Sequence, residues 1–383
     1  MPIDIEDLET PVPVVDMDRL ERNLARTAAY AKEHDLALRP HVKTHKAPFI
    51  AERQIRSGAR GLTCATPREI EVMSAASDDL LLAYPALGRS KLERLMNVAR
   101  HARLTVALDS VEAVQQLGAA ATAGGRDVAV YVELDLGMHR VGVQSAADAI
   151  GVIRAIGRYP SLRYGGITFY AGHIRDRVSD QHTKLDRLNH DVDAAVGELT
   201  KAGLAPPVVS GGSTPTIWQT HEIAHLTEMR PGTYVYNDRG TSEIGACTED
   251  DCALTVLATV VSTAVPGQAV VDAGCKALGR EPVRGVPGEG FGSVLGKPDV
   301  LVVSMSEEHG VLDLAKTSWR PRVGERVRIV PNHVCIVVHL HEAIVGLRGD
   351  VVETHWPVAA RGRMSAPYGD TVTSGTIGGP TEL

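Results

Sequence analysis

The sequence predicts an α/β protein made of a (β/α)8 barrel of the TIM type followed by a C-terminal all-β domain. Short apolar runs alternate with stretches of helical pattern eight times between residues 36 and 235, and such alternation is typical of a parallel sheet. Eight repeats over about 200 residues fit a closed barrel better than an open doubly wound sheet. Beyond residue 249 the apolar runs are separated by Gly and Pro turns, without a convincing helix.

The elements of the barrel domain, residues 21–248, are predicted in chain order. Before this domain, a strand at residues 12–15 leads into a helix that ends near residue 33. The barrel strands are predicted at residues 36–42, 61–64, 80–84, 104–108, 128–134, 164–169, 207–209 and 227–235. Helices are predicted at residues 47–57, 67–76, 90–102, 110–123, 146–156 and 181–202.

The β domain is predicted over residues 249–375. Its apolar runs lie at residues 253–261, 269–272, 300–304, 326–330, 336–340 and 342–346. The Gly- and Thr-containing end of the chain, residues 376–383, is expected to form a flexible tail.

Composition and charge describe an ordinary globular protein. The chain has 383 residues, of which 44% are hydrophobic and 23% charged, and its formal net charge of −7 does not suggest nucleic-acid binding. No apolar run approaches the roughly 18 residues of a membrane span, and the acidic residues 1–7 lack the pattern of a signal peptide. We therefore expect a cytoplasmic protein, whose five cysteines are thiols or metal ligands rather than disulfides.

Lys43, in the basic stretch of residues 39–46, is the first candidate for chemistry. It follows the first barrel strand, and parallel α/β sheets bind ligands at the carboxyl ends of their strands. A desolvated lysine can lose its proton and attack a carbonyl. Three neighbouring cations, Arg39, protonated His41 and Lys46, would lower its pKa further. A solvated basic turn is the alternative interpretation.

A candidate phosphate site follows the seventh strand. Residues 210–216 contain two glycines and the hydroxyls of Ser213 and Thr214, and a helix starting at Thr216 would add its N-terminal dipole. Late loops of this kind hold phosphate in barrel enzymes. The alternative is a plain loop with a helix cap.

Two further loops carry polar residues that could bind a ligand. At the eighth strand, Gly232 and Thr233 could offer amides to the same phosphate, and Arg230 could bond an aromatic nitrogen or a carboxylate. After the sixth strand, Tyr170 could stack on an aromatic ring and His173 could move a proton. The alternatives are a turn between domains and exposed loop side chains.

A candidate metal pair lies in the β domain. His333 and Cys335 are two residues apart, so in extended backbone they would point to one face and could share Zn²⁺. A buried thiol beside a hydrogen-bonded histidine is the alternative. His339 and His341 have the same spacing and are interpreted as exposed strand positions. His309 could supply a further ligand or a general base, or belong to a polar turn.

Together these stretches resemble the PLP-dependent enzymes of fold type III, in the branch of D-threonine aldolase and D-serine dehydratase. The similarity covers nearly the whole chain and includes RPHVKTHK (39–46), ELDLGMHRVGV (133–143), SGGSTP (210–215), VDAG (271–274), EHG (308–310), PNHVC (331–335) and WPVAARG (356–362). It implies an alanine-racemase-like barrel followed by a β domain, to which residues 1–20 also contribute.

The resemblance implies a role for each matching residue. Lys43 would form the Schiff base with PLP, Tyr170 would pack against the ring, and Arg230 would meet the pyridine nitrogen. The full cofactor-binding set would be Lys43, Tyr170, Ser213, Thr214, Arg230, Gly232, Thr233 and Tyr234, with Lys43, His173 and His309 as catalytic residues. His333 and Cys335 would hold Zn²⁺, Mn²⁺ or Mg²⁺. The family usually forms homodimers, and residues 272–280 would reach the partner's site.

The implied reaction uses PLP as an electron sink and the metal to lower the pKa of a substrate hydroxyl. We expect a lyase that cleaves D-β-hydroxy amino acids into glycine and an aldehyde. The alternative is a D-serine or 3-hydroxyaspartate dehydratase that releases ammonia and a 2-oxo acid. The His-x-Cys pair resembles the dehydratases, whereas residues 170–173 and 356–362 resemble the aldolases. An amino acid racemase and a non-catalytic PLP-binding protein are the remaining alternatives.

Overall fold

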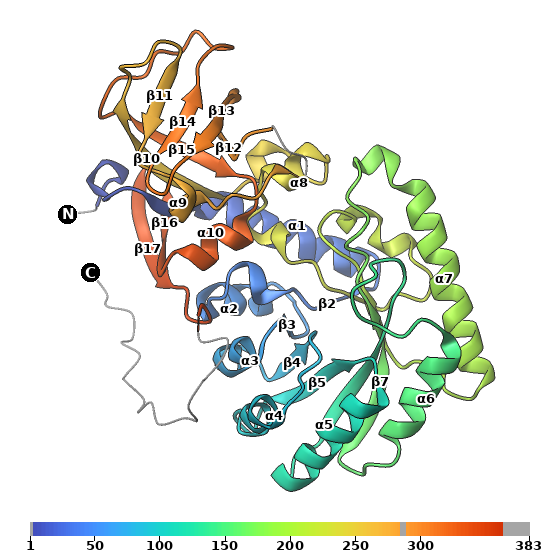
Figure 1. The fold of residues 1–383 in the computed structure, drawn as a ribbon. Helices are drawn as coiled ribbons and strands as arrows, with labels where there is room; N and C mark the ends of the chain where they lie inside the picture. Colours follow the sequence, from blue (N-terminus) through green and yellow to red (C-terminus); the bar gives the residue numbers. More distant parts are fainter. Residues whose placement is uncertain (1–2, 284–288, 363–383) are drawn as a thin grey trace.

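The computed structural model of the protein describes residues 3–283 and 289–362. It contains an eight-stranded parallel sheet and a nine-stranded, largely antiparallel sheet. Figure 1 shows the parallel sheet surrounded by helices and the second sheet stacked above it, with α10 in between. The predicted fold class, a TIM-type barrel with a C-terminal β domain, is confirmed.

The parallel sheet closes into a barrel. Its strands, in spatial order, are β2 (Ala37–Leu38), β9 (Glu228–Met229), β8 (Val209–Gly211), β7 (Leu162–Phe169), β6 (Val128–Leu134), β5 (Arg103–Leu108), β4 (Asp79–Leu82) and β3 (Leu62–Cys64). Beyond β2 the chain meets β3, where the Thr63 N–H donates to the Pro40 carbonyl at 2.9 Å and His41 bridges Thr63. All eight predicted strands are present, although the last is shorter and leads into the 3-10 helix η5 (Thr233–Val235).

Helices cover the outside of the barrel. They are α2 (Pro48–Arg56), α3 (Pro67–Met73), α4 (Arg89–Met96), α5 (Val111–Gly124), α6 (Ala146–Ile156) and α7 (His182–Lys201). Thr66, Ser110 and Ser145 cap α3, α5 and α6 by accepting the backbone N–H three residues later. Because the strands are covered on both faces, every residue of β4 and β6 is buried.

An ion network inside the barrel links strands that lead to the candidate site. Arg39, just after β2, donates to Glu228 of β9 and to Asp79 of β4, each at 2.7 Å. The Ser210 hydroxyl donates to the other oxygen of Glu228 at 2.7 Å. Burial lowers the pKa of Arg39, but the charges of Glu228 and Asp79 outweigh burial and raise it. Because buried charges need such full pairing, the network fixes β2 against β9, which lead to Lys43 and Arg230.

The second sheet combines the C-terminal half of the chain with one N-terminal strand. Its order is β11 (Gln268–Val271), β14 (Gly310–Asp313), β13 (Lys297–Met305), β12 (Gly292–Val294), β15 (Arg326–Pro331), β10 (Leu254–Ser262), β1 (Val12–Asp16), β16 (Ala343–Arg348) and β17 (Val351–Pro357). A further pairing of β10 with β11 closes the strands from β10 to β15 into a small barrel. Strand β1 lies between β10 and β16, and α1 (Met17–Glu33) then leads toward the larger barrel.

The prediction that the β domain lacks helices is wrong. It contains α9 (Cys275–Leu278) and α10 (Val334–Leu340), so residues 336–340 are helical rather than a strand. The buried residues Val334, Val337 and Val338 are spaced for one helix face, and a short apolar run alone does not separate strand from helix.

The structure also corrects the positions of two histidines. His339 lies in the last turn of α10, and His341 ends the helix, where its Nε2 is 3.0 Å from the Ala277 carbonyl. Neither is an exposed strand residue.

No described helix is long and apolar enough to cross a membrane. The end of the predicted β domain, residues 363–375, and the predicted tail, residues 376–383, lie outside the described residues.

Candidate active site

Two adjoining cavities open at the carboxyl ends of the barrel strands. The larger has a volume of about 510 Å³ and the smaller about 320 Å³. Both are lined by Lys43, Arg140, Tyr170, Pro215 and Thr233. Only the smaller cavity also reaches the β domain, through Asn332 and His333. Lys43 therefore lies where the two cavities meet, and most of the other residues that line them differ between the two.

A short 3-10 helix, η2 (Val42–Thr44), positions Lys43 directly after β2. The Lys43 N–H lies 3.4 Å from Nδ1 of His41, which caps this helix. Val42 and Thr44 are fully buried, while Lys43 is half-buried, with Nζ 5.5 Å from the centroid of the Tyr170 ring. The backbone of the lysine is thus anchored and its amine reaches both cavities.

The neighbours of Lys43 carry less free positive charge than the sequence suggested. Arg39 is paired with two carboxylates, and Lys46 donates to Glu69 at 2.5 Å. Burial, together with the charges of Lys43 and Arg230, holds the pKa of His41 well below its ordinary value, so this imidazole is neutral. The group of three free cations predicted around Lys43 is therefore not present.

One part of the larger cavity consists of small polar groups from two loops. Ser213 and Thr214 follow β8, and Gly232 and Thr233 follow β9. Gly232 leaves little space for a side chain, because a Cβ would lie 3.0 Å from the Thr44 hydroxyl and 3.2 Å from the His41 Cβ. The helix predicted at Thr216 is a short 3-10 helix, η4 (Ile217–Glu222). Hydroxyls and closely approaching backbone of this kind suit a phosphate group.

Tyr234 does not line the cavity with its side chain, in contrast to the predicted contact. Its ring is buried, and its hydroxyl accepts a hydrogen bond from Gln54 Nε2 at 3.1 Å. Its backbone N–H donates to the Thr214 hydroxyl at 3.2 Å. Tyr234 therefore supports Thr214 from behind the cavity wall.

Two buried charges, Arg230 and Glu133, lie elsewhere in the wall of the larger cavity. The Arg230 Nη2 donates to the Phe169 carbonyl at 2.6 Å, whereas its buried Nε has no hydrogen-bond partner. Burial lowers the pKa of Arg230 and raises that of Glu133. A bound ligand with a hydrogen-bond acceptor can satisfy a buried donor of this kind in a cavity wall.

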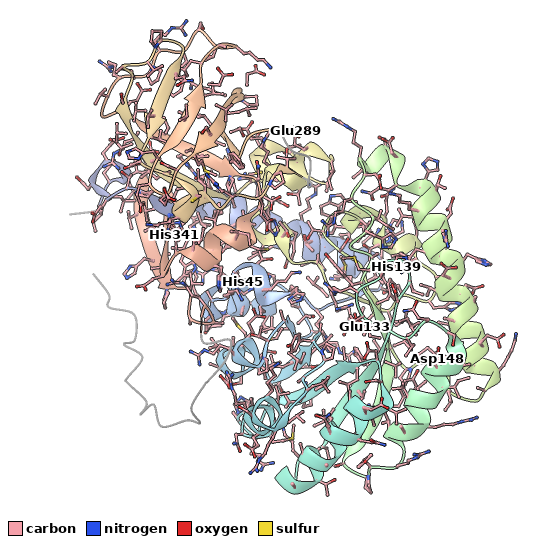
Figure 2. The ribbon with its side chains drawn as sticks, viewed as in Figure 1. His45, Glu133, His139, Asp148, Glu289 and His341 are labelled. Carbon is pink, nitrogen blue, oxygen red and sulfur yellow. The ribbon has the colours of Figure 1, made fainter. Side chains whose placement is uncertain are left out.

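Glu133 was not predicted as a site residue. It is the one acidic residue of β6, a strand whose other members are apolar or tyrosine, and Figure 2 shows it inside the barrel. A buried carboxylate near the carboxyl end of an apolar strand was the signal that could have identified it.

His173 and His309 lie outside both cavities. The His173 ring packs over Gly137, where an added Cβ would lie 3.0 Å from Cε1 and Nε2 of the ring. Burial lowers the pKa of His173, and its Nδ1 is buried without a partner. His309 is exposed at the turn between β13 and β14. The geometry of a single chain therefore does not support the catalytic roles predicted for these two residues.

His333 and Cys335 come together, though not through extended backbone. His333 precedes α10 as its N-terminal cap residue, and Cys335 lies in the first turn. Their side chains are hydrogen-bonding neighbours: the charge of Cys335 raises the pKa of His333, and the charge of His333 lowers that of Cys335 despite burial. No group of three or more His, Cys, Asp and Glu side chains suited to a metal occurs among residues 3–283 and 289–362. Any metal here would have open coordination positions, as catalytic sites require.

Asp238 orients His333 and was missed by the sequence analysis. Its Oδ2 lies 3.1 Å from His333 Nδ1 and accepts the Val334 N–H at 3.2 Å. Its Oδ1 accepts the Thr241 N–H at 2.8 Å, which caps α8 (Arg239–Glu243). A carboxylate on Nδ1 leaves Nε2 available for a metal. The only local signal was a capping pattern, Asp238 followed by Thr241.

If His333 and Cys335 hold a zinc ion, replacing Asp238 with asparagine is expected to weaken its binding by about 10- to 100-fold, the usual cost of losing the carboxylate behind a ligating histidine. Asparagine caps a helix about as well as aspartate, so α8 is retained. Zinc affinity is measured by competition with a chromophoric chelator. The matched control is Asp250→Asn, whose side chain is 91% exposed. Equal zinc affinity of Asp238→Asn and the unchanged protein would contradict this role.

The fold and the site define a class of enzyme. A barrel with a lysine where its first strand ends, a phosphate-type loop after a late strand and a β domain closing one side is the architecture of PLP-dependent barrel enzymes. Residues 15–240 match the model of the alanine racemase N-terminal domain, and residues 253–347 match the putative serine dehydratase domain. The chain belongs to this PLP-dependent alanine racemase N-terminal domain family, and the predicted resemblance is confirmed.

The relatives include both of the predicted enzyme types, aldolases and dehydratases. The chain is 31% identical to a D-threonine aldolase of Arthrobacter sp. over 360 residues, which cover 93% of each chain. It is 34% identical to a D-threo-3-hydroxyaspartate dehydratase of Delftia sp. over 371 residues, covering 91% of this chain and 97% of the relative. The crystal structure of D-threonine aldolase from Filomicrobium marinum superimposes with a TM-score of 0.86 at 33% identity, covering 94% and 98% of the two chains.

Proposed function

We propose that the protein is a PLP- and divalent-metal-dependent lyase that cleaves D-β-hydroxy amino acids into glycine and an aldehyde. The observation that carries this proposal is the position of Lys43, which lines both the cavity with the phosphate-type loops and the cavity that contains His333. A single amine can therefore serve a cofactor on one side and a substrate near a metal on the other.

The residues of the larger cavity fit PLP. Ser213, Thr214 and the backbone at Gly232 and Thr233 would hold the phosphate, and the unpartnered Nε of Arg230 would meet the pyridine nitrogen. Tyr170 offers an aromatic surface near Lys43, the attachment point. PLP supplies an electron sink for charge at the substrate Cα. Lys43 is the group placed to move a proton there, because its amine lies where the two cavities meet.

His333, which lines the smaller cavity, and its hydrogen-bonding neighbour Cys335 fit a divalent ion. The nitrogen–sulfur ligand set favours Zn²⁺ over Mn²⁺ or Mg²⁺. A bound ion lowers the pKa of a substrate hydroxyl, which favours cleavage of the neighbouring carbon–carbon bond. Asp238 holds the imidazole, and the Cys335 sulfur lies 3.4 Å from the hydroxyl of Thr44, next to Lys43. This contact ties the metal pair to the segment that carries the lysine.

Dehydration to ammonia and a 2-oxo acid is the second candidate reaction. The observation that favours it is Cys335, since the His-x-Cys pair resembles the dehydratases. The same parts serve both reactions, because Lys43 can take the Cα proton while the metal assists loss of the hydroxyl.

We expect product analysis to distinguish the two reactions. The protein is loaded with PLP and Zn²⁺ or Mn²⁺ and incubated with D-threonine, and the products are separated by chromatography. Glycine with acetaldehyde supports the proposed cleavage. Ammonia with 2-oxobutyrate contradicts it and supports the dehydratase. Exchange of the Cα proton of D- and L-alanine without net consumption would instead indicate a racemase.

A homodimer is part of the proposal. Residues 272–280, which include α9, would approach the site of the partner chain. Sedimentation of the PLP-loaded protein is expected to give the mass of two chains, and a monomer would contradict this.

A further inference from the structure

Glu133 is the only acidic residue that lines the larger cavity among residues 3–283 and 289–362. It shares the wall of this cavity with three cations, Lys43, Arg140 and Arg230. Glu133 is 6% exposed, and Figure 2 shows it inside the barrel. A carboxylate in such a position costs free energy unless an opposite charge compensates it. The proposed lyase chemistry gives this residue no role.

The backbone of Glu133 is held on two sides. In the parallel sheet, Glu133 of β6 pairs with Thr168 of β7. The Glu133 carbonyl also accepts the Val143 N–H at 2.9 Å, where the chain returns after the loop that follows β6. A neutral side chain of the same shape, glutamine, leaves these backbone contacts unchanged, so the charge of Glu133 can be removed by itself.

Arg230 reaches the same part of the cavity from the segment after β9. Its Nη2 donates to the Phe169 carbonyl at 2.6 Å, and Phe169 pairs with Leu134, the residue after Glu133. The guanidinium therefore lies next to the end of β6. Arg230 is 8% exposed, and its Nε has no hydrogen-bond partner. A carbonyl contact alone does not compensate for the burial of a full charge.

Glu133 and Arg230 are the main counter-charges of each other. Burial lowers the pKa of Arg230, and Glu133 is the largest of the charges that oppose this effect. Burial raises the pKa of Glu133, and Arg230 is the largest of the charges that oppose it. Glu228, the next carboxylate for Arg230, is already paired with Arg39. Arg140, the next cation for Glu133, is exposed, so water screens its charge.

We propose that Glu133 is a positioning residue for the cofactor, whose negative charge holds the Arg230 guanidinium in the cavity wall, where it meets the ring of PLP. This inference rests on the proposed PLP-dependent function and adds a residue to it. Glu133 acts through charge rather than through a hydrogen bond, since the guanidinium donates to Phe169. Without Glu133, the guanidinium would be a buried cation with a carbonyl as its partner. It would then turn toward water and would no longer be held for the ring nitrogen.

A double-mutant cycle tests whether Glu133 acts through Arg230. The four proteins are the unchanged chain, Glu133→Gln, Arg230→Gln and the double variant, and the dissociation constant of PLP is measured by visible absorption. Glu133→Gln should weaken PLP binding by about 10-fold in the unchanged chain, which is within the range for interacting neighbours. In the Arg230→Gln chain the same change should not weaken binding, because the residue on which Glu133 acts is absent.

The absorption spectrum gives a second readout that needs no turnover. Arg230→Gln should shift the visible absorption maximum of bound PLP, since hydrogen bonds to the ring nitrogen tune the electronics of the cofactor. Glu133→Gln should shift the maximum in the same direction by a smaller amount. Glu133→Asp keeps the charge and should leave the maximum near its original wavelength. The control is Glu198→Gln, which removes an exposed carboxylate on α7 and should change neither affinity nor spectrum.

The sign of the change in affinity separates this role from a direct effect of Glu133 on PLP. Loss of a negative charge by itself favours binding of an anionic cofactor, so tighter binding in Glu133→Gln would overturn the inference. Equal weakening in both chains, or an unchanged affinity and spectrum, would overturn it as well, and the PLP-dependent function would remain.

Folding of the variants and of the cofactor complex gives the remaining outcomes. If Glu133→Gln folds only in the Arg230→Gln chain, the uncompensated guanidinium is the cause and the inference stands. Failure to fold in both chains would contradict it. If the unchanged chain binds no PLP, the proposed function fails and the inference fails with it.

Discussion

Lys43→Ala is expected to abolish the visible absorption of the PLP-loaded protein and to lower turnover by about 10²- to 10⁴-fold or more, because the residue is both the attachment point and the proton-transfer group. Alanine removes an amine that lines both cavities. The backbone of η2 should be preserved, since Val42 and Thr44, the residues that anchor it, are unchanged. Absorption spectra and initial rates with a β-hydroxy amino acid measure the two effects.

Two controls distinguish loss of the function of Lys43 from misfolding of the variant. Lys201→Ala removes an exposed lysine at the end of α7, paired only with Glu198, and should change neither property. In the unchanged protein, borohydride reduction followed by peptide mass analysis should place the cofactor on the peptide containing Lys43. A visible band in Lys43→Ala, or a label on another lysine, would show that the assignment of Lys43 is wrong.

His333→Ala is expected to lose bound metal and the turnover of β-hydroxy substrates while keeping the visible absorption of PLP. The loss of metal affinity should exceed the about 10- to 100-fold that removal of an orienting carboxylate costs, because a direct ligand is removed. Metal content after dialysis, zinc titration and rates are the measurements. Treatment of the unchanged protein with a chelator should give the same loss of turnover, and Zn²⁺ or Mn²⁺ should restore it.

The matched control for this variant is His339→Ala, in the same helix but outside both cavities. If His333→Ala also loses PLP absorption, its role is structural. If the metal-free protein keeps full activity, the metal has no part in the reaction.

Much of the fold was predictable because its signals are local and repeated. The alternation of apolar runs with helical stretches predicted all eight strands of the barrel, and side chains such as Ser110 and Ser145 mark where helices begin. The motif of residues 39–46 placed Lys43 after the first strand, and that placement alone brings it to the carboxyl end of the sheet. Strand 227–235 was predicted too long because Gly232 and the residues after it turn into η5 to form the cavity wall.

Contacts between distant parts of the chain decided the rest. The run at residues 336–340 fits a strand or a helix equally well, and burial of Val334, Val337 and Val338 on one face made it α10. Asp238 meets His333 across 95 residues, and Arg39 meets Glu228 across 189. No local pattern encodes such pairs, since they form only when separate strands and loops are packed together.

By itself the sequence determined the fold class, the family and the place of Lys43 after the first barrel strand, because those depend on periodicity and on short motifs, whereas it misplaced His333 and Cys335 on extended backbone. Only the tertiary structure decided which groups become neighbours. Lys43 lines two cavities, Asp238 contacts His333, and Arg175 lines the same cavity as His333. The physical reason is that burial, pairing and charge balance are properties of neighbours in space, and neighbours in space are fixed by the closing of the barrel and its packing against the β domain.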